Sequence, residues 1–255
     1  PAGAGPQLAT MPLALPEPCL CLVTDRRVGD ESTLVHRAVE AVTGGVDMVQ
    51  VREKDLPGCH LLSLAASLQD AVKDAVGSRA LLIINERADV ALAAGADGVQ
   101  LAEDAMPVAA VRRIMGPQAL IGRSVHSEEG AVRAAADGAD FLIVGTMYAT
   151  SSHPAATPAG PGLVRRIAHL LAERATSIPL IGIGGITADN QGEVIRAGAA
   201  GVAVITNILA SPDPRGEAQR LKQAMLNAWS PTRASAGRGP GASGRTTPTG
   251  GSSTQ

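Results

Sequence analysis

GGVDMVQV (residues 44–51) is the first of four similar stretches and is followed by GADGVQL (95–101), GADFLIV (138–144) and GAAGVAV (198–204). In each stretch a glycine ends a helical pattern, and a continuous apolar run follows directly. Glycine adopts the left-handed conformation that ends helices at little cost. A continuous apolar run is typical of a parallel strand buried on both faces. The repeat therefore predicts helices and strands that alternate along the chain.

The segments on either side of these joints predict eight strands separated by eight helices. The predicted strands are residues 20–24, 47–51, 80–84, 97–101, 119–122, 140–144, 179–183 and 201–205. The predicted helices are residues 32–43, 61–76, 88–94, 108–115, a helix that begins after 127, 162–176, 187–197 and 214–229. This order predicts an α/β fold, a (β/α)8 TIM barrel, with its active site at the carboxyl ends of the strands. A doubly wound open sheet alternates in the same way and is the alternative.

Composition divides the chain into one domain and two flanking segments. Residues 1–18 are rich in Pro and Ala and predict an irregular lead-in, and residues 19–229 hold the barrel domain. Residues 230–255 are rich in Gly, Ser, Thr, Pro and Arg and predict a disordered tail. No leader pattern and no apolar run of membrane-spanning length stands out, which favours the cytoplasm.

The overall charge and the rare side chains exclude several classes of partner. The net charge is -2, and no basic cluster stands out in the predicted domain, so neither nucleic acid nor a membrane surface is an expected partner. Phe141, Tyr148 and Trp229 are the only aromatic residues, which argues against base stacking. Cys19 and Cys21 alternate along the first strand and are predicted to be small buried residues rather than metal ligands.

Charged residues follow three of the predicted strands. Arg52 and Lys54 alternate after the second strand, so both point the same way and suit an anion such as phosphate, although a solvated loop has the same pattern. Glu86 follows the third strand, and Glu103 and Asp104 follow the fourth. Acidic side chains that follow neighbouring strands could together bind Mg²⁺, which prefers oxygen ligands. The alternative is that Asp104 caps the next helix.

The fifth strand leads into Ser124 and His126, which alternate and could both face the barrel mouth. Histidine is suited to proton transfer near neutral pH, although a histidine at this place can equally cap or pack against a helix. A long loop (145–162) follows the sixth strand and is typical of a lid or binding segment. Gly184 and Gly185 follow the seventh strand, and a short helix near Thr206 follows the eighth. Together these indicate the phosphate site of a barrel.

Taken together, these residues resemble the thiamin phosphate synthase/TenI family. The likeness runs in order from Leu20 to Trp229. The segments that carry it are TDRR (24–27), QVREK (50–54), INERADVALAAGADGVQL (84–101), GRSVHS (122–127), GADFLIVG (138–145) and IPLIGIGGIT (178–187).

For the synthase branch, the resemblance implies that an aminopyrimidine methyl diphosphate and a thiazole phosphate are joined with Mg²⁺ assistance. These two phosphorylated small molecules would be the partners, and a small homo-oligomer is expected by analogy. The implied diphosphate ligands are Arg52, Lys54, Asn85, Ser124, Thr150, Ser152 and His153, the last in place of a lysine. The implied thiazole phosphate site is Gly184, Gly185 and the backbone of Ile205 and Thr206.

The metal site departs from the family pattern. Glu86 stands at the first metal aspartate, and the second metal position is Ala105, with Asp104 one residue earlier. These departures leave two alternatives open. One is the TenI-type thiazole tautomerase, which needs no metal and would use His126 for proton transfer. The other is a non-catalytic protein that binds a phosphorylated ligand.

Overall fold

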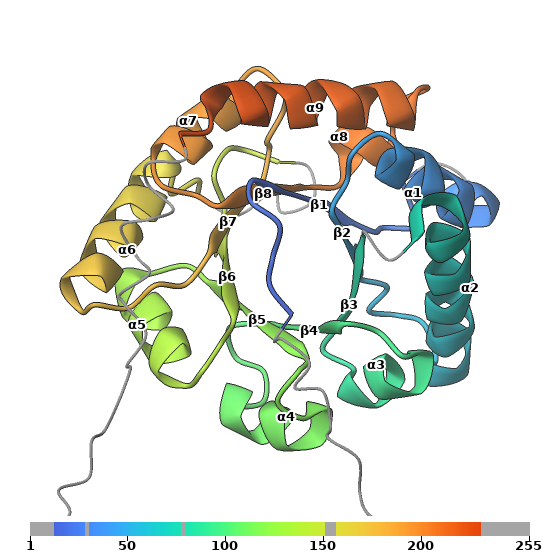
Figure 1. Cartoon of the computed structure of the whole chain (residues 1–255), viewed down its shortest axis with the longest axis horizontal. Coiled ribbons are helices and arrows are strands. Elements are labelled where there is room, and N and C mark those ends of the chain that lie inside the picture. Colours follow the sequence, from blue (N-terminus) through green and yellow to red (C-terminus); the bar gives the residue numbers. More distant parts are fainter. Residues whose placement is uncertain (1–12, 29–30, 78–79, 151–156, 231–255) are drawn as a thin grey trace, which may run out of the picture.

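Eight parallel strands close into a barrel in the order β1 to β8 in the computed structural model, and helices surround the strands (Figure 1). The structure describes residues 13–28, 31–77, 80–150 and 157–230. The strands are β1 Cys19–Val23, β2 Met48–Val51, β3 Leu81–Asn85, β4 Gly98–Leu101, β5 Leu120–Val125, β6 Phe141–Gly145, β7 Leu180–Ile183 and β8 Gly201–Val204. The closed barrel confirms the TIM barrel and rules out the open sheet.

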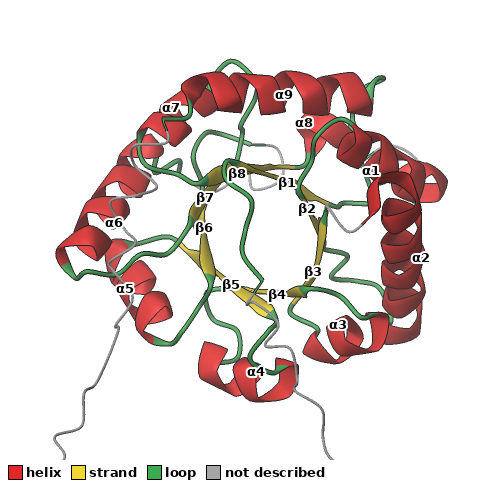
Figure 2. Cartoon of the chain, in the orientation of Figure 1, coloured by secondary structure: helices red, strands yellow, loops and turns green. Residues whose placement is uncertain are grey.

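The helices form a ring outside the strands (Figure 2). They are α1 Leu34–Thr43, α2 Gly58–Val76, α3 Ala88–Ala94, α4 Val108–Met115, α5 Glu128–Ala136, α6 Pro161–Glu173, α7 Gln191–Arg196, α8 Thr206–Leu209 and α9 Pro214–Ala228. A 3-10 turn, η1 Glu31–Thr33, precedes α1, and α8 is the short helix expected after the last strand. Among the described helices, none combines the length and the apolar character needed to cross a bilayer.

The four repeated stretches form the joints at the amino-terminal end of the barrel. The aligned glycine of each has a positive φ, from 66° at Gly95 to 113° at Gly198, as predicted for a helix that ends on glycine. Three joints continue with an aspartate whose Oδ2 accepts a backbone hydrogen bond of 2.7 Å from the neighbouring strand. The pairs are Asp47 with Leu20, Asp97 with Leu82, and Asp140 with Ile121. The fourth joint has Ala200 in the equivalent place.

The core has two parts, one inside the barrel and one between the barrel and the helices. Cys19 and Cys21 lie in the inner part and are fully buried, which confirms them as small buried residues. Burial raises the pKa of the Cys21 thiol well above its ordinary value. Phe141 fills the same interior. At the carboxyl ends of the strands, residues of the inner core such as Val23 and Ile143 line a cavity together with polar side chains.

Two element boundaries differ from the prediction in ways that affect the site. β5 continues to Val125 instead of stopping at residue 122, because Arg123, Ser124 and Val125 pair with β6. α7 begins at Gln191 instead of residue 187, since the Asn190 side chain first closes a turn by accepting the backbone N–H of Thr187 at 2.9 Å. Ser124 is therefore held on a strand and not on a loop.

Candidate active site

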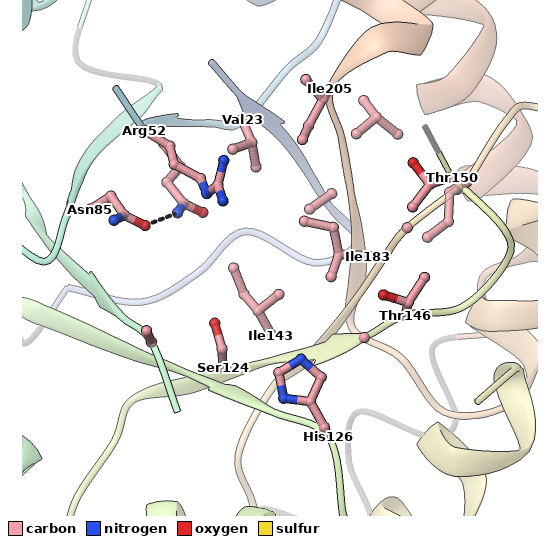
Figure 3. A pocket seen from close by; sticks show the side chains of 18 of the residues that line it. Val23, Arg52, Asn85, Ser124, His126, Ile143, Thr146, Thr150, Ile183 and Ile205 are labelled. Atoms are coloured by element: carbon pink, nitrogen blue, oxygen red, sulfur yellow. Dashed lines mark hydrogen bonds between the residues drawn. The ribbon is translucent and has the colours of Figure 1, made fainter. Parts of the chain in front are cut away.

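A cavity of about 620 Å³ opens at the carboxyl ends of the strands. Figure 3 shows Arg52 and Asn85 on one side of it and Thr146 and Thr150 on another, with apolar side chains such as Ile143 between them. Many of the residues predicted from the sequence line this cavity. They are Arg52, Lys54, Asn85, Asp104, Ser124, His126, Thr150, Gly184, Gly185, Ile205 and Thr206. Ser152 and His153 lie outside the described residues.

Strand alternation explains why Arg52 and Lys54 both face the cavity. Glu53, between them, points the other way and is 4% exposed. Its Oε1 accepts the Thr24 hydroxyl at 2.6 Å, and both of its oxygens accept the Arg26 backbone N–H at 3.2 Å. Within the described part of the chain, no carboxylate forms an ion pair with either cavity cation. Their charge is available to a ligand.

A chain of side-chain amides joins β2 to β3 beside these cations. Gln50 Nε2 donates to Asn85 Oδ1 at 3.0 Å, which is the dashed line at Asn85 in Figure 3. Asn85 Nδ2 donates in turn to Glu86 Oε2 at 3.2 Å. Glu86 has a left-handed backbone, with φ 60°, and lines a smaller cavity of about 130 Å³ together with Lys54 and Asn85. Glu86 therefore lies beside the main cavity and does not line it.

The loop after β4 brings Glu103 and Asp104 to the main cavity. Arg123 on β5 holds this loop by donating to the backbone carbonyls of Glu103 at 2.8 Å, Ala105 at 3.2 Å and Met106 at 2.9 Å. Glu103 Oε2 lies 2.7 Å from His126 Nδ1. Sequence reasoning gave Glu103 no role toward His126, because the two residues meet only when β4 and β5 lie side by side.

Gln100, on β4, is a polar residue to which the sequence analysis gave no role in the site. It is 2% exposed, and its Nε2 donates to Ser124 Oγ at 3.0 Å. Gln50 and Gln100 occupy inward positions in strands that are otherwise apolar. A polar residue at such a position was the signal available in the sequence, since buried polar groups in a barrel need a partner.

The glycine turn after β7 packs tightly against the start of the long loop. Gly184 and Gly185 have positive φ values of 106° and 61°, and a Cβ on Gly185 would lie 2.5 Å from the carbonyl oxygen of Ala149. Tyr148 donates its backbone N–H to the Gly184 carbonyl at 3.0 Å. Its hydroxyl donates to Glu193 at 3.1 Å, and burial together with this carboxylate raises the pKa of Tyr148 to about 12. The turn exposes backbone at the cavity because no side chain fits there.

No group of three or more His, Cys, Asp or Glu side chains is spaced to hold a metal ion among the residues that the structure describes. Two acids near the cavity follow neighbouring strands, with Asp104 after β4 in the lining and Glu86 after β3 beside it.

Residues 20–208 match the family model described as thiamine monophosphate synthase. The chain is 46% identical over 204 residues to the thiamine-phosphate synthase of Methanoculleus marisnigri, a match that covers 80% of this chain and 93% of the relative. It is 39% identical over 219 residues to the corresponding protein of Roseiflexus castenholzii, covering 85% and 92%. The solved structure of thiamine phosphate pyrophosphorylase from Pyrococcus furiosus has a TM-score of 0.72 and 33% identity, covering 82% of this chain and 96% of that one.

Proposed function

The chain belongs to the thiamine monophosphate synthase family, and we propose that its cavity joins an aminopyrimidine methyl diphosphate to a thiazole phosphate. The bond between the methylene carbon and the diphosphate oxygen breaks, and its electron pair leaves with the diphosphate. The lone pair of the thiazole nitrogen then forms the new bond to that carbon. The products are thiamin phosphate and diphosphate. Arg52 and Lys54, which line the cavity and have no ion-pair partner among the described residues, are the observation that carries this proposal.

The diphosphate is the part of the substrate that gains charge as the bond breaks. Arg52 and Lys54 line the cavity from the segment that follows β2, and Asn85, Ser124 and Thr150 add neutral polar groups around it. Positive groups fixed where negative charge develops stabilise a leaving group more in the transition state than in the ground state. Ser152 and His153 stay predictions for the same group.

The acids beside the cavity fit Mg²⁺. Asp104 lies in the lining, and Asn85 donates to Glu86 beside the cavity, so hard oxygen donors come from the loops after two neighbouring strands. Mg²⁺ is commonly held by one or two carboxylates plus substrate phosphates, which matches this small donor set. We assign Asp104 and Glu86 as the residues that would hold it. When bound, it would neutralise charge on the leaving diphosphate.

The glycine turn after β7 and the start of α8 suit the phosphate of the second substrate. Gly184 and Gly185 line the cavity with bare backbone, and Ile205 and Thr206 line it from the end of β8. Backbone N–H groups in the loops after strands seven and eight form the usual phosphate site of barrel enzymes. The two anionic groups of the substrates would then bind at separate parts of one cavity.

The contact between Glu103 and His126 favours a second candidate activity, the thiazole tautomerase. A carboxylate on Nδ1 orients an imidazole so that Nε2 can exchange a proton with a substrate. By contrast, the proposed coupling reaction forms a bond at the thiazole nitrogen without any proton transfer. Family membership supports either enzyme over a non-catalytic binding protein. A homo-oligomer and a cytoplasmic location stay predictions.

A paired assay on the purified chain tests both activities with and without Mg²⁺. One arm supplies the aminopyrimidine diphosphate and the thiazole phosphate and follows thiamin phosphate. The other supplies the non-aromatic thiazole carboxylate phosphate and follows its aromatisation. We expect Mg²⁺-dependent thiamin phosphate in the first arm. Metal-independent aromatisation alone would make the chain a tautomerase, and silence in both arms would overturn the enzyme proposal.

A further inference from the structure

Gln50 and Gln100 sit in matching places on β2 and β4, where they are 3% and 2% exposed. Each donates a side-chain N–H to a residue on the following strand. The distance is 3.0 Å both from Gln50 Nε2 to Asn85 Oδ1 and from Gln100 Nε2 to Ser124 Oγ. Each also keeps a buried Oε1 that has no hydrogen-bond partner among the described residues. A buried acceptor without a partner costs about 1–3 kcal/mol. Stability alone therefore does not explain glutamine at these positions.

The direction of both amides follows from neighbours that can only accept. Gln100 Nε2 also donates to the Leu101 carbonyl at 3.3 Å, so an oxygen in its place would face another oxygen. On the other strand pair, Asn85 Nδ2 donates to the Glu86 carboxylate, which leaves Asn85 Oδ1 facing Gln50. Gln50 must then present its nitrogen. Reversing either amide would bring two acceptors together.

These directions determine what the cavity offers to a ligand. The Ser124 hydroxyl has one proton and two lone pairs, and Gln100 occupies one lone pair. The hydroxyl proton stays available to an acceptor in the cavity. Asn85 is similar, because its oxygen is occupied by Gln50 and one of its two N–H protons by Glu86, which leaves the second N–H.

We infer that Gln100 is a positioning residue that presents Ser124 to the cavity as a hydrogen-bond donor for an anion. The inference rests on the proposed function for the identity of that anion, a diphosphate group. Gln50 holds Asn85 in a similar way but also lines the cavity, where it can contact a ligand directly. Gln100 places no charge in the site and leaves the Ser124 hydroxyl proton to a ligand that accepts hydrogen bonds.

The barrel wall makes room for this arrangement at Gly122. A Cβ at this position would lie 2.0 Å from Gln100 Oε1 and 2.3 Å from Phe141 Cζ, so a side chain on β5 would displace the glutamine. Gln100 is not part of the cavity lining, whereas Gln50 is. A substitution of Gln100 must therefore act on a ligand through Ser124, which makes it the cleaner test.

The experiment measures the binding of inorganic diphosphate by calorimetry, so that no turnover is needed. Gln100→Met keeps the length of the side chain and removes the donor. We expect its Kd for diphosphate to rise about fivefold, the equivalent of one lost hydrogen bond. Ser124→Ala should weaken binding at least as much, and the double variant should bind no worse than Ser124→Ala. The Tm of Gln100→Met should stay the same or rise, because the unpaired Oε1 is gone.

Gln100→His supplies a second variant, since a ring N–H can also donate to Ser124. It should restore affinity to within about twofold of the wild type. Unchanged binding by Gln100→Met, or effects of Gln100→Met and Ser124→Ala that simply add, would overturn the inference and leave the proposed function standing. A wild-type chain that binds no diphosphate would overturn both.

Discussion

The two ends of the barrel use polar residues in opposite ways. At the amino-terminal end, Asp47, Asp97 and Asp140 each accept a backbone N–H, and two of them also pair with a cation. At the carboxyl-terminal end, Arg52 and Lys54 face a cavity without an ion-pair partner among the described residues. Paired groups hold strands and helices together, whereas unpaired groups are free to bind a ligand. The same fold therefore separates stability from chemistry along its axis.

The largest effect should come from replacing Arg52, which lines the cavity at the carboxyl-terminal end of the barrel. Arg52→Met removes a fixed charge from the proposed diphosphate site, and we expect kcat/KM for the diphosphate substrate to fall roughly 100-fold. Steady-state kinetics measure this, and thermal unfolding should show an unchanged Tm. Arg52→Lys is the matched control and should recover part of the loss. An unchanged kcat/KM for Arg52→Met would count against placing Arg52 at the substrate.

The opposite end should respond in stability and not in activity. Asp97→Ala leaves the Leu82 N–H without its side-chain acceptor, and we expect the free energy of unfolding to fall by about 1–3 kcal/mol. Urea unfolding measures the loss, and KM for both substrates should stay unchanged. A variant that keeps its stability but loses substrate affinity would break the separation between the two ends.

The contribution of Asp97 to stability should also depend on pH. Burial raises the pKa of Asp97, so folding favours its neutral form, and its contribution to stability falls as pH rises through that pKa. Asp97→Asn keeps an acceptor for Leu82 without the charge. We therefore expect Asp97→Asn to be at least as stable as the wild type at pH 7, with the difference shrinking as the pH falls towards 4. A difference that grows on acidification would contradict this sign.

A smaller effect should follow from loosening the loop after β4. Arg123→Met removes three hydrogen bonds to the backbone of residues 103–106 but touches neither proposed substrate group. We expect the Mg²⁺ concentration that gives half-maximal activity to rise about fivefold, because Asp104 is held less firmly. Activity measured against a Mg²⁺ titration shows the shift. The same curve as the wild type would mean that the loop holds its shape without Arg123.

The smallest effect on coupling should come from the exposed pair of Glu103 and His126. The two side chains are 39% and 58% exposed, so their contact adds little stability. Glu103→Gln and His126→Ala should each leave the formation of thiamin phosphate within about threefold of the wild type. Aromatisation of the thiazole substrate, if the wild type performs it, should be lost in His126→Ala. A large loss of coupling in both variants would place the pair in the synthase reaction.

The sequence alone predicted the alternating strands and helices, because each joint combines a glycine that ends a helix with an apolar run typical of a doubly buried strand. It left the open sheet as an alternative, and the pairing of β1 with β8 in the structure closes the barrel. The sequence also placed Arg52 and Lys54 at the carboxyl end of a strand, since alternation is a local rule. Which polar groups meet was decided only by the tertiary structure. Gln100 reaches Ser124, and Glu103 reaches His126, across two strands that lie side by side once the barrel closes. Such contacts depend on register and side-chain direction, which local patterns of residues do not encode.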